Sequence, residues 1–213
     1  MKKVSFRGRQ DKLELMVQVF QPYLLGNVLD VGCDQKVIRP FVRGHYVGID
    51  IGGAPDVYVN AEYGLPFRDK GFDTVIAFDS LEHLDRVHFV FDEICRVASR
   101  YVIVGLPNMY EWRFRLMFLI GKRISGKYGL PIDAPCDRHR WLFSLKDARE
   151  FVYQRGKQNG FQVVDEAFGY YKYRKPIARL VTALGHLLGL CGERGMPLFV
   201  YHYWAVLERR LSE

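Results

Sequence analysis

Two short apolar runs that each carry a carboxylate constrain this chain more than any other feature. The first, Val28–Val31, contains Asp30 and leads into Gly32, and the second, Tyr46–Asp50, ends twenty residues after Asp30. In nucleotide-binding α/β units, a glycine after the first strand lets a ligand approach the backbone, and an acid about 20 residues later accepts hydrogen bonds from ribose hydroxyls. The sequence therefore predicts a site for an adenosine-containing cofactor.

The turn after the first run distinguishes between cofactors. It reads Gly32-Cys33-Asp34-Gln35-Lys36 and holds one glycine, whereas a dinucleotide fold uses Gly-x-Gly-x-x-Gly to bring a helix N-terminus to a pyrophosphate. Asp34, at the expected start of a helix, would also repel a diphosphate. Asp30 suits an ammonium or a sulfonium instead, and S-adenosylmethionine carries both groups.

These residues resemble the class I S-adenosylmethionine-dependent methyltransferases, and specifically the type 11 group, whose members act mostly on small molecules. The resemblance covers roughly residues 10–170 and follows the family's order through blocks at 28–34, 47–50, 60–62, 65–67, 72–84, 106–108, 139–144 and 160–161. Residues 72–84 form the most specific block, because its Leu-Glu-His-Leu ending is typical of the group. The resemblance implies that S-adenosylmethionine is the cofactor.

The resemblance also implies which residues hold this cofactor. Asp50 would bind the ribose hydroxyls, and Asp30 would lie near the amino acid end. The full set of expected cofactor-binding residues is Asp30, Gly32, Cys33, Asp50, Ile51, Asn60, Ala61, Glu62, Asp79 and Ser80. No metal ligand is expected.

Two departures from the family pattern affect this site. Asp34 and Gln35 stand where the family usually has further glycines, so side chains occupy a place where bare backbone usually passes the methionine part of the cofactor. Asn60 stands where the family often has an aspartate that contacts the adenine amino group. An asparagine can still accept that hydrogen bond through its carbonyl oxygen.

The order of apolar runs predicts an α/β fold. Strands are expected at 27–31, 45–50, 57–59, 72–78, 101–105, 161–167 and 198–207, and helices at 11–25, 87–98 and 145–159. Asp11 with Glu14, and Ser144 with Asp147, are read as capping boxes, and Gly160 as a helix terminator. The alternation implies a Rossmann-like, mostly parallel sheet with helices on both faces, and the resemblance adds that the seventh and last strand is antiparallel.

Two histidines are the candidates for acid–base catalysis. His83 follows Glu82 at the end of the most specific block, and His139 lies in a polar loop flanked by aromatic residues. A base is required only when the acceptor must lose a proton, and histidine can take one near neutral pH. Glu82 and His83 have a structural alternative as a helix-start pair, and His139 could contact the substrate without acting as a base.

Length and composition favour one methyltransferase domain over residues 1–213. The 49% hydrophobic content is sufficient for a continuous core, and residues 109–143 and 175–196 are read as lid-like helical insertions. Four cysteines, with no Cys-x-x-Cys spacing, favour a reduced, cytoplasmic protein without structural zinc. No uninterrupted apolar core follows the basic N-terminus, so no signal peptide is expected.

The net charge of +7 raises the question of nucleic acid substrates. Phe78-Asp79-Ser80-Leu81 stands where base-amino methyltransferases carry Asn/Asp-Pro-Pro-aromatic, and the only cysteine after a proline, Cys136, lies in a variable loop. Small molecules are therefore favoured over nucleic acid.

Two segments, 112–123 and 176–191, mix cations with apolar residues and are too short to span a bilayer. They are read as lid helices, with peripheral membrane contact or an amphiphilic acceptor as the alternative.

The sequence thus predicts S-adenosylmethionine-dependent methyl transfer to a small-molecule or amphiphilic acceptor. The alternative is a non-catalytic module that binds S-adenosylmethionine or another adenosine ligand and has lost its glycine turn. A nicotinamide-dependent oxidoreductase is disfavoured because the turn has one glycine.

Overall fold

The computed structural model describes residues 2–124, 126–130, 132–133, 138–187 and 196–210. The strands are β1 (Lys2–Phe6), β2 (Val28–Val31), β3 (Tyr46–Asp50), β4 (Val57–Tyr58), β5 (Phe72–Phe78), β6 (Ala98–Pro107), β7 (Phe161–Tyr171) and β8 (His202–Arg209). The helices are α1 (Arg9–Phe20), α2 (Val87–Val97), α3 (Trp112–Leu119), α4 (Leu145–Gln158), α5 (Pro176–Leu187) and α6 (Met196–Phe199).

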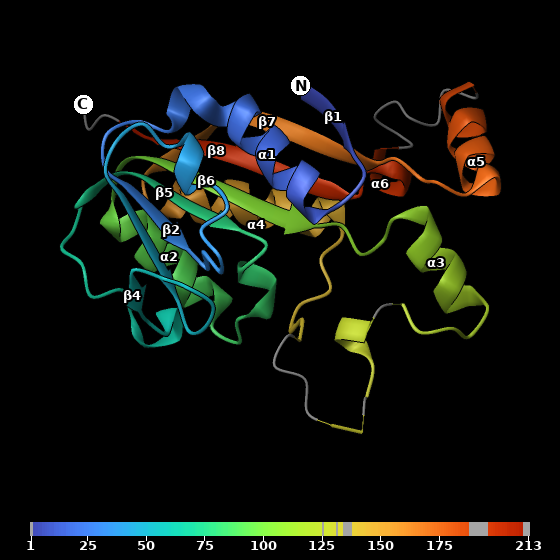
Figure 1. Cartoon of the computed structure of the whole chain (residues 1–213), viewed down its shortest axis with the longest axis horizontal. Coiled ribbons are helices and arrows are strands. Elements are labelled where there is room, and N and C mark those ends of the chain that lie inside the picture. The colour runs from blue at the N-terminus through green and yellow to red at the C-terminus, as the bar shows by residue number, and fades with distance from the viewer. Residues whose placement is uncertain (1, 125, 131, 134–137, 188–195, 211–213) are drawn as a thin grey trace.

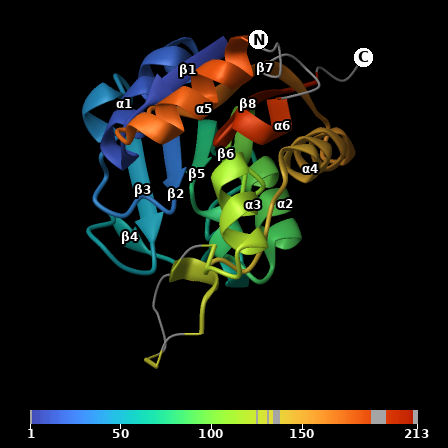
Figure 2. The ribbon, with the colours of Figure 1, turned by 90° about the vertical axis from the view of Figure 1, so that its right-hand side faces the viewer.

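All eight strands form one sheet in the order β1-β7-β8-β6-β5-β2-β3-β4 (Figure 1). β8 runs antiparallel to both of its neighbours, β6 and β7, and the other pairs are parallel. Helix α1 covers one face, and α2 and α4 cover the other (Figure 2). The predicted α/β class, the helices on both faces and the antiparallel last strand are therefore confirmed.

The predicted strand count of seven is wrong, because the chain begins with an additional strand. β1 pairs in parallel with β7 at the edge of the sheet, and of its five residues only Phe6 is buried. An edge strand has one partner and keeps polar side chains such as Lys2 and Lys3, which protect an exposed edge from pairing with other chains. This composition removes the apolar pattern from which the other strands were predicted.

The central strands carry nearly continuous apolar runs because helices cover both of their faces. β2 is buried at all four positions, and β8 is buried from His202 to Leu207. Side chains on one face pack with α1, and those on the other pack with α2 and α4. The strands that carry the predicted site are thereby fixed on both sides.

Two predictions about helices near the site are corrected. Helix α1 begins at Arg9 rather than at Asp11, and the Asp11 carboxylate accepts the Arg7 N–H instead of closing a capping box with Glu14. No α-helix follows the turn at Gly32; turns and a short 3₁₀ helix, Arg39–Phe41, lead to β3. A left-handed backbone within that turn, described below, interrupts helical geometry there.

The two expected lid segments are partly described. Helices α3 and α5 lie within them, while residues 125, 131, 134–137 and 188–195 lie outside the described residues, as do Cys136 and Cys191. The two described cysteines, Cys33 and Cys95, are buried free thiols. Within the described ranges, no helix has the length and apolar character needed to cross a membrane.

The capping box predicted at the start of α4 is confirmed. The Ser144 hydroxyl accepts the Asp147 N–H at 3.1 Å, and the Asp147 carboxylate accepts the Ser144 N–H at 3.1 Å. Gly160 adopts a left-handed φ of +77° just after the helix, as a helix terminator requires.

We expect Ser144→Ala to lower the free energy of unfolding by about 1 kcal/mol, because a helix N–H loses its side-chain acceptor. Urea denaturation measures the change. Gln154→Ala, at an exposed position in the middle of the same helix, is the control and should stay within about 0.5 kcal/mol of wild type. Equal losses in both variants would contradict a role for the cap.

Candidate functional site

Asp30 is a buried carboxyl group at the carboxyl end of β2. It is 4% exposed, and its Oδ2 accepts a hydrogen bond from the Tyr46 hydroxyl at 2.6 Å. Burial raises the pKa of Asp30 to about 7, the Tyr46 hydrogen bond opposes this increase, and the charge of Asp50 adds to it. Near neutral pH the group can therefore gain or lose its proton, and a cationic ligand would favour the ionised form.

Gly32 allows the turn after β2 to lie against the turn after β5. Its φ is +81°, and a Cβ there would lie 2.5 Å from the Cβ of Ser80. Any side chain would therefore clash and would also be held in the left-handed region. The expected site residues Gly32 and Ser80 are in this way brought together from two strands.

Asp34 adopts the backbone conformation that a glycine favours. Its φ is +46°, and Lys36, two residues later, has a φ of +54°. The Asp34 N–H donates to Asp50 Oδ2 at 2.9 Å, and the Asp34 carboxylate lies 3.1 Å from the Arg9 guanidinium. The turn thus holds a left-handed backbone at a position that carries a side chain.

Asp50 ends β3 and organises the loops around it. Its Oδ2 accepts the Asp34 N–H, and its Oδ1 accepts the N–H groups of Ile51 at 2.7 Å and Gly52 at 3.1 Å. A carboxylate offers about four lone-pair sites, of which three are in use here. The geometry therefore leaves room for one further donor, such as a single ribose hydroxyl.

Asp79 is the centre of a buried ionic cluster. Its two carboxylate oxygens contact Lys12 Nζ and His202 Nε2, and its φ of +51° lies in the left-handed region. Burial alone would raise the pKa of Asp79, but the charge of Lys12 and the contact with His202 outweigh it and hold the pKa well below its usual range. Asp79 is therefore ionised and already paired.

His202 is neutral in this cluster. Burial and the charge of Lys12 lower the pKa of His202 to about 4. Its Nε2–H donates to Asp79, and its Nδ1 has no hydrogen-bond partner among the described residues. A protonated ring would place a second N–H at that buried nitrogen without an acceptor.

Lys12 and His202 are site residues that the sequence does not predict, although one signal for Lys12 exists. Lys12, Met16 and Phe20 recur at the i, i+4 and i+8 positions of α1, and all three are buried. A lysine on the apolar stripe of a helix needs a buried acid as partner. His202 lies in the apolar run of β8, where no pattern separates it from the core.

The space between these groups is small. A cavity of about 30 Å³ is lined by residues of α1, β2, the turn after β2 and β5, including Arg9, Asp30, Asp34 and Asp79. That volume matches one water molecule, whereas cofactor sites measure roughly 300–1,000 Å³. The carboxylates fit the ammonium and the ribose of an adenosine cofactor, and the cavity that α1 and the turn after β2 line beside Asp30 is smaller than such a cofactor.

The other expected cofactor-binding residues line the same edge in different environments. Ile51 has an exposed side chain, Asn60 Oδ1 accepts the Glu62 N–H and caps a short 3₁₀ helix, and Ala61 is buried. Glu62 Oε1 also accepts the Arg86 N–H at 2.8 Å. The Asn60 oxygen predicted to face adenine is thus already bonded to the backbone.

Cys33 is unsuited to nucleophilic chemistry, although it lines the cavity. Burial and the neighbouring carboxylate of Asp30 raise the pKa of the Cys33 thiol to about 12. The reactive thiolate is therefore absent at neutral pH.

The two candidate catalytic histidines lie together beside Glu82. The His83 and His139 rings meet edge to face with centroids 4.6 Å apart, and one ligand-type atom from each histidine and from Glu82 lies within 4.8 Å of the others. Glu82 is 2% exposed, and burial, followed by the charge of Asp79, raises its pKa to about 8. The structure thus gathers residues 56 positions apart in the sequence.

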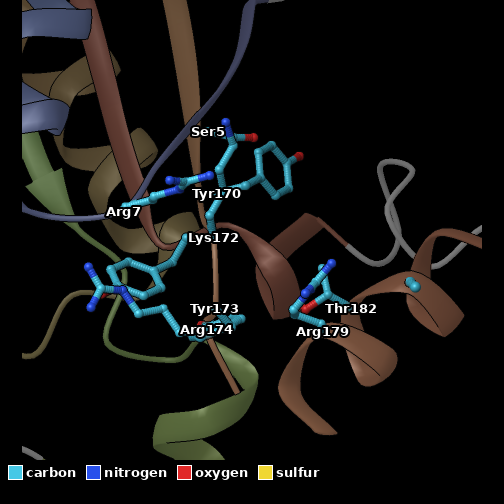
Figure 3. Close-up of a pocket in the computed structure, with 10 residues that line it drawn as sticks. Ser5, Arg7, Tyr170, Lys172, Tyr173, Arg174, Arg179 and Thr182 are labelled. Carbon is cyan, nitrogen blue, oxygen red and sulfur yellow. The ribbon is translucent and has the colours of Figure 1, made fainter. Parts of the chain in front are cut away.

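A larger, basic pocket lies at the other edge of the sheet (Figure 3). It measures about 640 Å³ between the ends of β1 and β7 and helix α5. Its four cations come from three segments, and no carboxylate is among its lining residues; the cations are Arg7, Lys172, Arg174 and Arg179. This composition suits an anionic ligand. His139 does not line it.

Comparison with known proteins identifies both the family and the fold. The family model of the methionine biosynthesis protein MetW matches residues 56–183. No curated protein matches the chain.

The fold is that of the class I S-adenosylmethionine-dependent methyltransferases. An S-adenosylmethionine-dependent methyltransferase from Archaeoglobus fulgidus is 17% identical, with a TM-score of 0.63, and 96% of each chain is covered. Magnesium protoporphyrin IX methyltransferase from Synechocystis PCC 6803 is 18% identical, with a TM-score of 0.57 over 94% of this chain and 83% of that one. The [4+2]-cyclase SpnF is 16% identical, with a TM-score of 0.55 over 97% and 85%. At such identities the likeness shows the fold alone.

We expect Asp34→Gly to raise the free energy of unfolding by about 0.5–1 kcal/mol, because glycine adopts a positive φ without steric cost. The lost ion pair with Arg9 joins two largely exposed side chains, so it contributes little. Thermal and urea denaturation measure the change. Asp34→Ala is the control, because it removes the same charge but keeps a Cβ at positive φ; it should be less stable than wild type. Equal stability of the two variants would contradict backbone strain.

Proposed function

Since the chain belongs to the family of the methionine biosynthesis protein MetW, we propose that it binds S-adenosylmethionine and transfers its methyl group to a small-molecule or amphiphilic acceptor. One observation carries the proposal: Asp30, a buried carboxyl group with a pKa near 7, lies beside the Gly32 turn and twenty residues before Asp50. A buried acid that is poorly compensated by protein cations is suited to a cationic ligand.

The proposed binding roles follow from the hydrogen-bonding capacity and charge that each side chain does not use within the protein. Ionised Asp30 would accept the ammonium group, and Asp50 would accept one ribose hydroxyl. Arg9 pairs with Asp34 through a largely exposed contact, so it can turn to a ligand carboxylate at little cost. Because the present cavity is small, we propose that α1 moves away from the sheet when the cofactor binds.

The proposed chemistry asks the protein mainly to position two reactants. S-adenosylmethionine supplies a methyl group on a sulfonium, and in-line alignment of an acceptor can provide most of the acceleration. If the acceptor is a hydroxyl, His83 or His139 can take its proton, because both lie just beyond the carboxyl end of β5.

The basic pocket suggests the character of the acceptor. β7 is four strand positions from β2, which corresponds to roughly 19 Å at the usual strand spacing. The pocket could therefore hold only a remote, anionic part of a long acceptor whose reacting atom lies near Asp79. This arrangement favours an amphiphilic acceptor with a negative group.

The small cavity supports a second candidate function. A non-catalytic module that binds S-adenosylmethionine or an adenosine ligand would need Asp30 and Asp50 but no acceptor site. The buried pair between Lys12 and Asp79 lies at the carboxyl end of β5, so Asp79 already has a partner in the protein. Methyl-labelled S-adenosylmethionine, incubated with the protein and a metabolite extract, separates the two functions. Labelled product supports methyl transfer, and calorimetric binding without any labelled product supports the module.

We predict that the affinity for S-adenosylmethionine increases about 5- to 10-fold from pH 6 to pH 7.5, because Asp30 ionises with a pKa of about 7. Binding of the ammonium group requires the ionised form, so protonation at lower pH weakens it. Isothermal titration calorimetry at both pH values measures the change. Asp30→Asn should bind more weakly and lose this pH dependence.

Asp50→Ala is the matched control for the Asp30 measurement. It should lose about 1.5–3 kcal/mol of binding free energy, the contribution of one charge-assisted hydrogen bond. It should keep a pH dependence, moved to lower pH because the Asp50 charge no longer raises the pKa of Asp30. Unchanged affinity in Asp50→Ala would contradict its assignment to the ribose. A pH dependence that survives in Asp30→Asn would contradict the assignment of the ammonium site.

We also propose that α3 contacts anionic membranes or amphiphiles. Phe118 and Leu119 are 73% and 81% exposed, and cations such as Arg115, Lys122 and Arg123 lie in the same segment. Apolar side chains beside cations are typical of surfaces that bind anionic lipid.

We predict salt-sensitive cosedimentation with anionic vesicles and none with neutral ones, since each well-placed cation contributes about 1 kcal/mol that salt screens. Phe118→Ser with Leu119→Ser should reduce binding. Leu25→Ser, which removes an exposed apolar side chain before β2, should not. Equal binding to both vesicle types, or none to either, would return α3 to the role of a lid.

A further inference from the structure

Glu82, His83 and His139 form a cluster of metal-ligand side chains beyond the carboxyl end of β5. One ligand-type atom from each lies within 4.8 Å of the others. The backbone holds this arrangement firmly: the Arg140 N–H donates to the Glu82 carbonyl at 2.8 Å, and the Trp141 indole N–H donates to the Leu84 carbonyl at 2.7 Å. The loop that carries His139 is therefore fixed to the segment that carries the other two ligands.

Hydrogen bonds assign the protonation of both rings. His83 Nδ1 lies 3.2 Å from the Arg138 carbonyl oxygen, which can only accept, so Nδ1 carries the hydrogen. Tyr128 donates its one hydroxyl hydrogen to the Trp141 carbonyl at 2.6 Å, so its oxygen accepts from His139 Nδ1 at 3.1 Å. In each neutral ring the lone pair is then at Nε2.

This is the arrangement found around bound metals. Metal-ligating histidines usually donate their other ring N–H to a carbonyl, carboxylate or hydroxyl group, which fixes the tautomer and the ring orientation. Glu82 supplies the anionic partner. Its Oε2 is buried and has no hydrogen-bond partner among the described residues, a costly state that an ion would relieve.

We propose that Glu82, His83 and His139 bind one divalent transition-metal ion through Oε2 of the glutamate and Nε2 of each histidine. Two imidazoles with one carboxylate suit Zn²⁺, Co²⁺ or Fe²⁺, whereas Mg²⁺ and Ca²⁺ prefer oxygen ligands. Three protein ligands leave at least one coordination position open, as in sites that bind an exogenous ligand.

If the chain transfers methyl groups, the open coordination position could bind the acceptor. This role of the metal, unlike metal binding itself, rests on the proposed function. With the metal on both Nε2 atoms, neither histidine can act as a base. An acceptor hydroxyl bound at the open position would instead lose its proton to water more readily, because the ion would lower the pKa of that hydroxyl.

Calorimetric titration of the chelator-treated, full-length protein with ZnCl₂ tests the site. We expect one equivalent to bind, and MgCl₂ not to bind at the same concentrations. His83→Ala, His139→Ala and Glu82→Gln should each weaken Zn²⁺ binding by more than about 100-fold. Tyr128→Phe should weaken it by about 10-fold, because it removes the acceptor at His139 Nδ1 but none of the three ligands. His45→Ala, an exposed histidine elsewhere, is the control and should bind as wild type does.

The visible spectrum of the Co²⁺ form tests the open position, since added azide should shift the bands only where a site on the metal is available. Circular dichroism establishes that each variant is folded, and Tyr128→Phe and His139→Ala alter half-buried side chains, so folding should survive. Absence of Zn²⁺ and Co²⁺ binding in wild type, or equal Zn²⁺ affinity in wild type and folded His139→Ala, would overturn the proposal. A Co²⁺ spectrum that azide leaves unchanged would overturn the open position.

Discussion

The ion pair between Lys12 and Asp79 fixes helix α1 to the carboxyl edge of the sheet, beside the small cavity that Asp30 and Asp79 line. It joins α1 to the end of β5, and His202 of β8 contacts the same carboxylate. Removing one partner of such a buried pair typically costs about 3–5 kcal/mol, because the other charge is left without compensation. An outward movement of α1 that separates this pair would have to offset a cost of that order. Under the proposed movement, cofactor binding and the position of α1 would be coupled through Asp79.

This coupling explains why the two candidate functions share the same residues. A ligand that binds only with α1 displaced must provide the free energy for that displacement, so its apparent affinity falls by the population of the open state. In a catalytic protein, a closed complex that excludes water would offset the free energy of displacing α1. In a binding module, the displacement of α1 would itself report that the ligand is bound. In both cases Asp30 and Asp50 would hold the cofactor, and Asp79 would need a new partner if α1 withdrew Lys12.

The sequence predicts the central fold well because buried strands have little freedom in composition. β2, β5 and β8 are covered on both faces, so their apolar runs are nearly continuous and easy to find. The apolar pattern does not predict β1, because this edge strand is mostly polar. The start of α1 differs from the predicted one, because the Asp11 carboxylate accepts the Arg7 N–H instead of closing a capping box. Acids at the ends of two strands could be found by spacing alone. The partners of these acids could not, since Lys12, Tyr46 and His202 lie within apolar patterns, and Tyr128 meets His139 only through the path of a loop.

The carboxyl groups at this edge differ in the positive charge that the protein places beside each of them. Asp79 has Lys12 beside it and is ionised, whereas Asp30 has only a neutral hydroxyl as partner, and burial holds its pKa near 7. Glu82 lies close enough to Asp79 for that charge to raise its pKa as well. Neighbouring carboxylates disfavour one another's ionised forms, and Lys12 offsets this effect by direct contact at Asp79. A cation that binds at Asp30 or at Glu82 would stabilise the ionised form there in the same way. An ammonium at Asp30 and a metal ion at Glu82 are the two forms of compensation that the neighbouring side chains favour.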